Sequence, residues 1–301
     1  MLLTTLANVR GWVGSQAGTD DALLSRLITV ASQQILMELQ RPDLGLTTVT
    51  EILDGKDTPK IQLRNWPAAS VTALSVNGTA IPASTGYPVY GYQLEKLVGS
   101  QAGRPQSVSI IGGTGIDGVY IANGVAQFAQ VGGSYRPFSR GMGNISVTYQ
   151  YGYVVQNEAQ TVATSGSAYL VTPNAPYGSF GGDLGVTYAS NGTALTAKPP
   201  GTVLSTGQYI APTLTGENPV PNYLFAAGDA GVAVLINYNY IPAPLEQACI
   251  ETVGERYSYK GRIGMKTKSL GGEETASYDI SGLSAAVMEM IRPYKLVYVG
   301  Y

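Results

Sequence analysis

The chain of 301 residues is predicted to adopt an α+β fold, in which its two ends form a discontinuous helical core and large β-rich insertions lie between them. Charged side chains are concentrated at the ends: 13 lie in residues 1–80, 14 lie in 242–301, and only 11 lie in the 161 residues between. Apolar residues recur at helical spacing near both ends, whereas the middle alternates with a period of two and is divided by Gly, Asn and Pro.

The N-terminal segment contains two predicted helices. The stronger one covers Asp20–Leu39, where apolar residues form a single stripe. Thr19 is its predicted N-cap, and the pair Asp20 and Asp21 lies where the helix dipole favours negative charge. A shorter helix is predicted over about residues 3–13. We place both in the helical core.

The middle of the chain is predicted to consist of strands joined by turns. Its clearest strands are TTVTEILDG at 47–55, SVTALSVNG at 70–78, NISVTYQYGY at 144–153 and GVAVLINYNY at 231–240. The last two share a Tyr-x-Tyr end, which we interpret as the sign of an insertion. We therefore predict a β-rich subdomain over 47–155 and an inserted β-domain over 156–241.

Helical spacing returns at Pro244, a favourable residue for a first helical turn, and continues through PLEQACIETVGERYSYK. A polar loop and a closing helix, SGLSAAVMEMIRPYK, follow. Residues 1–46 and 242–301 together make up the predicted helical core.

Composition excludes several classes of function. Histidine is absent, which removes Ser-His-Asp and Cys-His catalysis and imidazole ligation of metals. The formal net charge of −2 gives no general attraction to nucleic acid or anionic membrane. The single cysteine, Cys249, forms no internal disulfide framework and is predicted to be a small core residue. We also expect no signal peptide and no membrane span, and hence synthesis in the cytoplasm.

Two motifs have weak functional interpretations. Gly113–Gly118 matches G-x-G-x-x-G, but strand-like residues follow it where a dinucleotide site requires a helix, so a β-turn is expected. Residues 54–57, DGKD, offer too few oxygen ligands for calcium. We expect no catalytic residue, no cofactor and no metal, and hence no enzyme.

An ordered set of segments resembles the head-to-tail connector (adaptor) family of tailed phages. It comprises LTTLANVRGWVG with DDALLSRLITVASQQILMELQRP, then TVTEILDGKDTPKIQLRNWPAASVTALSVNGTAI, then NISVTYQYGY, and finally PAPLEQACIETVGERYSYK through to the closing helix. The set covers roughly half of the chain, and ordinary family members are much shorter. The segment GVTYASNGTALTAKPPGTVLSTGQYIAP, with YLFAAGDAGVAVLINYNY, resembles a β-module that recurs in phage structural proteins.

The resemblance implies a structural role in the neck of the virion, between the capsid portal and the tail. It implies a homo-oligomeric ring of about twelve copies that binds the portal protein and extends the DNA channel. Viral DNA would pass through the lumen without sequence-specific binding, and a tail, stopper or tail-terminator protein would dock below. A near-neutral subunit suits passage of DNA better than its capture.

Two groups of residues are candidate partner-binding sites. The first is the basic cluster in the loop before the last helix, for which a solvated loop neutralised by Glu273 and Glu274 is the alternative. The second is the apolar, β-prone tail, which would add as a strand to a partner such as the portal, or pack on its own subunit. The two groups consist of Lys260, Arg262, Lys266 and Lys268, and of Leu296, Val297, Tyr298, Val299 and Tyr301.

Tyrosines at the strand ends, such as Tyr149 and Tyr238, fit either a subunit interface or ordinary sheet packing. Two other functions remain open on the sequence. One is a tail-completion or baseplate subunit, because the second β-module is not specific to connectors. The other is a receptor-binding or carbohydrate-binding β-protein, because the middle is rich in Gly and Tyr.

Overall fold

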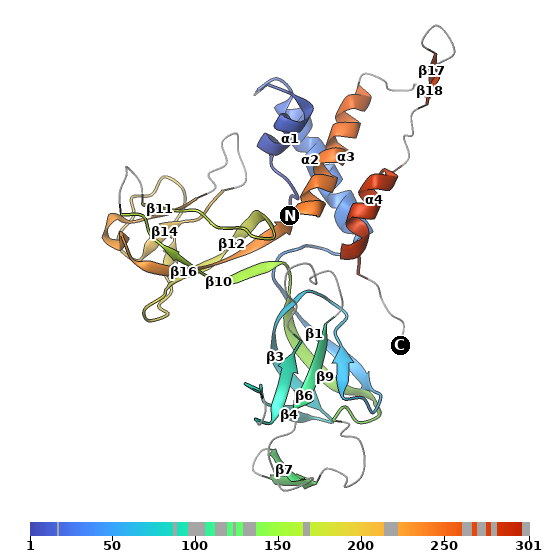
Figure 1. The fold of residues 1–301 in the computed structure, drawn as a ribbon, viewed down its shortest axis with the longest axis vertical. Coiled ribbons are helices and arrows are strands. Elements are labelled where there is room, and N and C mark those ends of the chain that lie inside the picture. The colour runs from blue at the N-terminus through green and yellow to red at the C-terminus, as the bar shows by residue number, and fades with distance from the viewer. Residues whose placement is uncertain are drawn as a thin grey trace. The chain divides into compact units, whose positions relative to one another are not determined.

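A computed structural model describes residues 1–16, 18–86, 89–95, 106–111, 119–122, 125–128, 137–164, 169–213, 222–260, 267–269, 275–277 and 282–296. The predicted α+β class is confirmed: helices from both ends of the chain accompany many strands in several sheets (Figure 1). The described residues divide into two compact units. One is built from Met1–Gly45 and Val154–Lys295, and the other from Leu46–Tyr153 together with Leu296.

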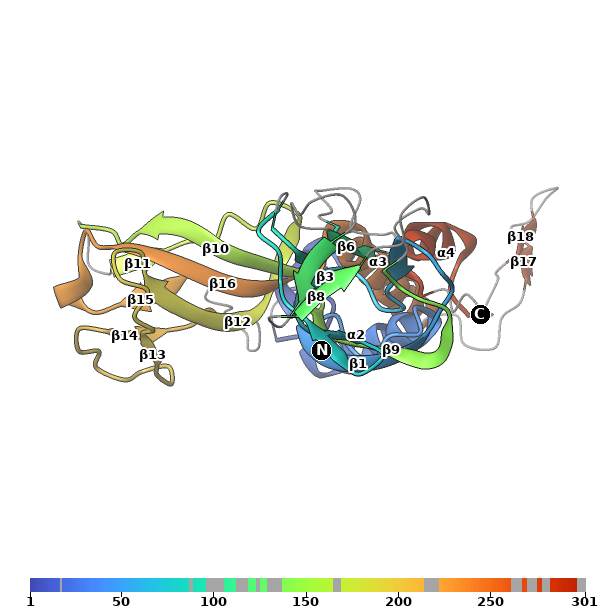
Figure 2. The ribbon, with the colours of Figure 1, turned by 90° about the horizontal axis from the view of Figure 1, so that it is seen from below.

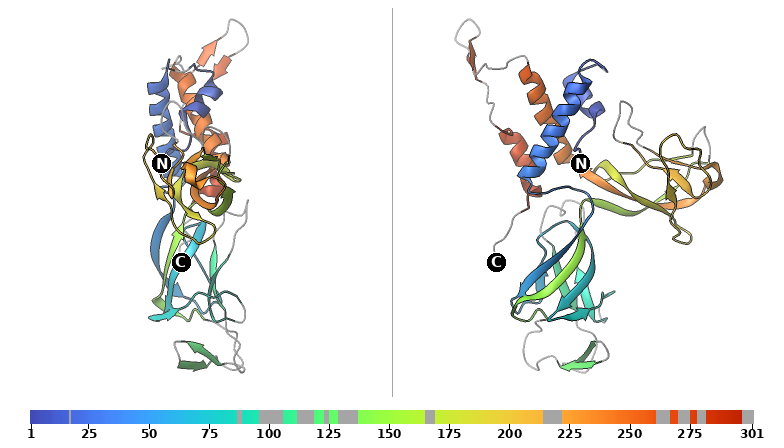
Figure 3. Two further views of the ribbon diagram at one scale, coloured as in Figure 1. Left: turned by 90° about the vertical axis from the view of Figure 1, so that its left-hand side faces the viewer. Right: turned by 180° about the vertical axis from the view of Figure 1, so that it is seen from behind.

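The helical core joins segments from opposite ends of the sequence. Helices α1 (Leu6–Val13), α2 (Asp21–Glu38) and α3 (Ala243–Tyr259) pack against one another, and α4 (Ala285–Ile291) packs on α3 (Figure 3). A 3-10 turn, Arg292–Tyr294, continues α4. The residues buried between these helices form the core of this part; they are Leu3, Val9, Leu24, Ile28, Ala31, Ile35, Leu245, Ala248, Cys249, Val253, Val287 and Ile291.

The ends of these helices are defined by local hydrogen bonds. Helix α1 begins at Leu6 rather than near Leu3, because the Thr5 side chain accepts a hydrogen bond from the Asn8 amide and so acts as N-cap. The predicted Thr19 cap of α2 is wrong: Asp20 occupies the N-cap position, and its side chain makes no capping hydrogen bond. The Asp20 carboxylate has other partners, described below.

The unit Leu46–Tyr153 contains two main sheets. The first has the order β1-β9-β3-β4 and the second β2-β6-β5, and a hairpin β7-β8 is also present (Figure 1). Strand β1 covers the predicted range 47–55, and the predicted turn Asn77-Gly78 joins β3 to β4 with φ of 51° and 77°. The strands are β1 (Thr47–Gly55), β2 (Lys60–Gln62), β3 (Ala68–Val76), β4 (Thr79–Ile81), β5 (Gly91–Leu94), β6 (Ser107–Ile111), β7 (Val119–Ala122), β8 (Val125–Phe128) and β9 (Gly141–Tyr151).

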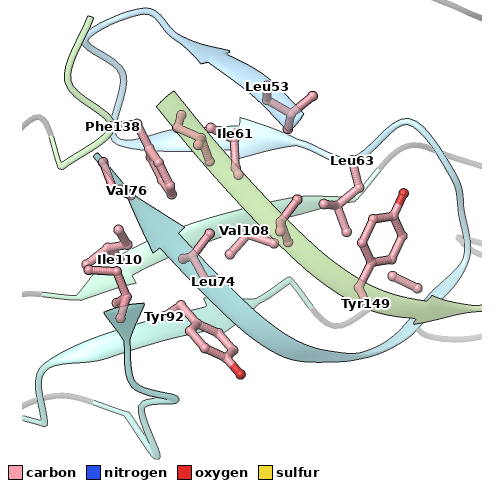
Figure 4. Packing of buried hydrophobic residues seen from close by; sticks show 14 of the residues in the cluster. Leu53, Ile61, Leu63, Leu74, Val76, Tyr92, Val108, Ile110, Phe138 and Tyr149 are labelled. Carbon is pink, nitrogen blue, oxygen red and sulfur yellow. The ribbon is translucent and has the colours of Figure 1, made fainter. Parts of the chain in front are cut away.

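The core of this unit lies between the two main sheets. Strand β9 is central in the first sheet, and its alternate residues Ile145, Val147 and Tyr149 are fully buried. Residues from the second sheet, such as Val108, complete the cluster (Figure 4). The strict alternation of apolar residues along β9 therefore reflects one face turned to the core.

The inserted β-region contains two further sheets, with the orders β10-β16-β12 and β11-β15-β14-β13 (Figure 2). Aromatic rings form much of its interior, where Phe180 contacts Tyr223 and Tyr238. The elements are β10 (Val154–Thr161), β11 (Tyr169–Val171), β12 (Gly178–Tyr188), β13 (Thr196–Ala197), β14 (Gln208–Ile210), β15 (Tyr223–Phe225), the 3-10 turn η2 (Ala227–Asp229) and β16 (Ala233–Pro242).

The first and last strands of this region are neighbours. Strand β10 enters it and β16 leaves it, and the two pair antiparallel from Val154 opposite Asn239 to Thr161 opposite Ala233. The chain thus returns close to its point of entry, as an insertion requires. Strand β16 then runs directly into α3.

A short hairpin lies between the last two helices in the sequence. Strands β17 (Thr267–Ser269) and β18 (Thr275–Ser277) form a two-stranded hairpin between α3 and α4. None of the described helices has both the length and the apolar character that crossing a bilayer requires. A third domain over 156–241, separate from the helical core, remains a prediction.

Candidate functional site

Lys260, the first residue of the basic cluster, forms an ion pair with Asp20. Lys260, just beyond the end of α3, places Nζ 3.0 Å from Oδ1 of Asp20, and its ammonium lies 5.1 Å from the centre of the Tyr257 ring. The Tyr257 hydroxyl donates to Oδ2 of Asp20 over 2.6 Å. These hydrogen bonds, from Tyr257 first and Lys260 second, hold the pKa of Asp20 below its ordinary value. Lys260 is thus neutralised by Asp20, which joins the start of α2 to the end of α3.

Asp21 connects α1 to α2 in a similar way. The Arg10 guanidinium donates Nε to Oδ1 of Asp21 over 2.7 Å and Nη2 to Oδ2, and the Gly18 amide also donates to this carboxylate. The hydrogen bonds from Arg10 lower the pKa of Asp21. The acidic pair at the start of α2 therefore connects three helices, in addition to its favourable position on the helix dipole.

The rest of the basic cluster is only partly within the described residues. Lys268 belongs to strand β17. Arg262, Lys266, Glu273 and Glu274 lie outside the described residues. The Gly113–Gly118 motif also lies outside them, and the strand β7 that follows it is not the helix that a dinucleotide site needs.

The chain leaves the helical core beside the far end of α2. Lys295 Nζ lies 2.6 Å from Oε1 of Glu38, and Arg41 Nε donates to the carbonyl oxygen of Tyr294 over 2.9 Å. Leu296, the first residue of the predicted docking tail, is buried. The remaining tail residues, Val297, Tyr298, Val299 and Tyr301, lie outside the described residues.

The outer face of α2 is exposed and almost without charge. Val30 and Met37 are 42% and 72% exposed on it, although both are large and apolar. We call this surface the α2 face; it consists of Ala22, Ser25, Arg26, Thr29, Val30, Gln33 and Met37. Our sequence reasoning did not identify it. The signal was present, since Arg26 is the only charged residue between Asp21 and Glu38.

The tyrosines at the strand ends belong to the interior of the subunit. Tyr149, Tyr151, Tyr153, Tyr238 and Tyr240 are all buried, so packing within the subunit accounts for them. Cys249 is buried as predicted, and burial raises its pKa to about 11. These residues do not form an exposed site.

Several tyrosines donate hydrogen bonds to carboxylates in the inserted region. The hydroxyls of Tyr209 and Tyr223 lie 2.7 and 2.9 Å from the two oxygens of Asp183, and Tyr238 donates to Glu158 over 2.6 Å. Burial is the main cause that raises the pKa of each of these tyrosines. A phenol with a raised pKa stays protonated, so these groups act as hydrogen-bond donors that hold strands together.

The acidic residues near 54–57 are also used within the fold. Asp54 accepts a hydrogen bond from the Gly143 amide over 2.6 Å, and Asp57 accepts one from the Arg140 amide over 2.9 Å. Within the described part of the chain, no group of three His, Cys, Asp or Glu residues is arranged to hold a metal ion. No family model matches the chain, and no curated protein matches it either.

Proposed function

We propose that this protein is a structural subunit of a tailed-phage virion, a head-to-tail connector that forms a ring beneath the portal and has no enzymatic activity. The observation that best supports the proposal is the helical core, which unites both ends of the chain and presents the exposed α2 face. The resemblance implies a core of this layout, with β-regions inserted between its halves.

The α2 face suits contact with a neighbouring subunit. Val30 and Met37 provide apolar area, and the small residues Ala22 and Ser25 allow a second backbone to approach closely. Burial of charge would oppose such a contact, and Arg26 is the only charged residue on the face. A ring requires two different complementary surfaces per subunit, of which the α2 face would supply one.

The burial of the tyrosines counts against the carbohydrate-binding alternative. Sugar-binding surfaces use exposed aromatic rings, whereas Tyr209, Tyr223 and Tyr238 lie in the interior and donate to carboxylates. Tyr177 is the exposed tyrosine among the described residues of this region, at 47%. The tail-completion or baseplate alternative differs from a connector in its partner. Binding to the portal is therefore the property that distinguishes it from a connector.

The test is the mass of the full chain in solution, measured by light scattering, alone and with purified portal ring. We expect a particle of about twelve times the 31.6-kDa chain, or a monomer that the portal converts into a ring. A ring that forms without affinity for the portal would support the tail-completion function. A stable monomer or trimer indifferent to the portal would overturn the proposal.

A further inference from the structure

A groove of about 300 Å³ lies within the unit Leu46–Tyr153, along one edge of each main sheet. Its walls come from the end of β1, from β2 and from the segment that joins them. Among the described strands, β1 and β2 are each the terminal strand of their sheet. The groove therefore runs beside two strand edges, whose backbone groups are suited to pairing with an added strand.

The rim of the groove is basic. Lys56, Lys60 and Arg64 line it and are exposed, and Asp54 is the acidic residue among the described side chains that line it. Asp57, in the joining segment, accepts a hydrogen bond from the Arg140 amide. Asp54 already accepts a hydrogen bond from the Gly143 amide. A local excess of positive charge on a chain of net charge −2 favours an acidic ligand.

The floor of the groove is apolar. Leu53 and Ile61 are buried below it and extend into the core from adjacent segments (Figure 4), whereas Ile52 is 64% exposed at its side. From Lys60 to Arg64, exposed and buried residues alternate. The charged side chains thus follow the period of two with which an added strand presents its own side chains.

We propose that this groove binds an extended acidic segment of a partner protein, which adds as a strand beside β1 or β2 and directs carboxylates to Lys56, Lys60 and Arg64. An extended peptide fits better than single-stranded nucleic acid, because no aromatic side chain is among the described residues that line the groove, and stacking on such rings is the usual means of holding bases. The inference does not depend on ring formation.

The experiment uses the full chain and a fluorescein-labelled peptide of about eight residues that alternates Val and Glu. Binding is measured by fluorescence anisotropy at low salt. The double variant Lys56→Glu/Lys60→Glu is expected to bind about tenfold more weakly, whereas the matched double charge reversal Lys198→Glu/Arg292→Glu, at two residues outside this unit, is expected to bind as the wild type does. Circular dichroism spectra of both variants verify that they are folded.

Two further probes test the mode of binding. A peptide methylated at alternate backbone nitrogens keeps its charge but loses strand pairing, so we expect it to bind weakly. A Val-Lys peptide is expected not to bind. The proposal is overturned if the acidic peptide does not bind, if the methylated or basic peptide binds equally well, or if an oligothymidine binds in its place. Light scattering of the same samples reports the oligomeric state separately, so failure here does not bear on the connector function.

Discussion

The Asp20 carboxylate joins the start of α2 to the end of α3 through hydrogen bonds from Tyr257 and Lys260. Its position predicted a favourable interaction with the helix dipole, and it does lie at the start of α2. Its two partners, Tyr257 and Lys260, are more than 200 positions away in the sequence, and no local pattern indicates them. The sequence therefore explains why an acidic residue suits this position. It does not indicate the contacts with Tyr257 and Lys260, because these depend on how the two ends of the chain pack together.

The Asp20 contacts predict a pH-dependent contribution to stability. Because the pKa of Asp20 in the folded protein lies below its ordinary value of 3.8, the contribution is fully present above 3.8 and is lost as the pH falls through the lower folded value. Asp20→Asn should therefore lower the urea midpoint at pH 7, and the difference from wild type should shrink only below about pH 4. A difference already absent at pH 6 would contradict this assignment.

Glu246 connects three parts of its unit. It accepts hydrogen bonds from Asn8 over 2.7 Å, from Thr4 over 3.4 Å and from Ser179, and it is 9% exposed. Glu246→Ala leaves these donors without their acceptor and should cost about 1–3 kcal/mol in urea unfolding. Glu289→Gln removes an exposed carboxylate from α4 and serves as the control, with a change near zero.

Cys249 should be unreactive in the folded protein. It is fully buried, and the pKa of about 11 leaves little thiolate at pH 8. We expect slow reaction with a disulfide reagent under native conditions and rapid reaction in guanidinium. Rapid native labelling at pH 8 would show that the packing between α2 and α3 opens readily.

At the scale of elements, most strands and helices followed from the sequence because local patterns determine them. Strand β1 and the turn at Asn77-Gly78 lie where alternation and turn chemistry placed them. The sequence did not indicate which strands pair with one another. Periodicity does not encode contacts between distant segments. Such contacts determine that β10 pairs with β16 and that β1 and β2 are terminal strands of two different sheets.

The α2 face gives a prediction at this scale. Val30→Glu combined with Met37→Glu places charge on an exposed surface, so the free energy of unfolding of the subunit should change by only about 0.5 kcal/mol per site. If the chain forms the proposed ring, its assembly, followed by light scattering, should be lost because the charges would be buried against a neighbour. Met142→Glu combined with Val203→Glu, at two residues that are each 93% exposed and lie outside α2, is the matched control and should assemble normally.

At the scale of the molecule, the charge distribution distinguished the ends from the middle but did not indicate where compact units begin. The structure places one boundary between Gly45 and Leu46 and another between Tyr153 and Val154. Tyr153 and Val154 follow each other within a continuous β-rich stretch, so composition does not change at that point. Only the change of pairing partner, from β9 with β1 and β3 to β10 with β16, separates the units.

This division predicts that residues 46–153 fold alone. The segment has its own core, in which Ile145, Val147 and Tyr149 of β9 are fully buried between its two sheets. Its buried Glu51 is also satisfied internally, because Asn65 donates to it over 2.8 Å and Tyr149 donates as well. The isolated fragment should therefore show near-ultraviolet circular dichroism and a single cooperative thermal transition. A fragment ending at Gln127 loses β9 and should remain unfolded. If fragment 46–153 melts without cooperativity, its core depends on the rest of the chain and the boundary at Tyr153 does not define an independent domain.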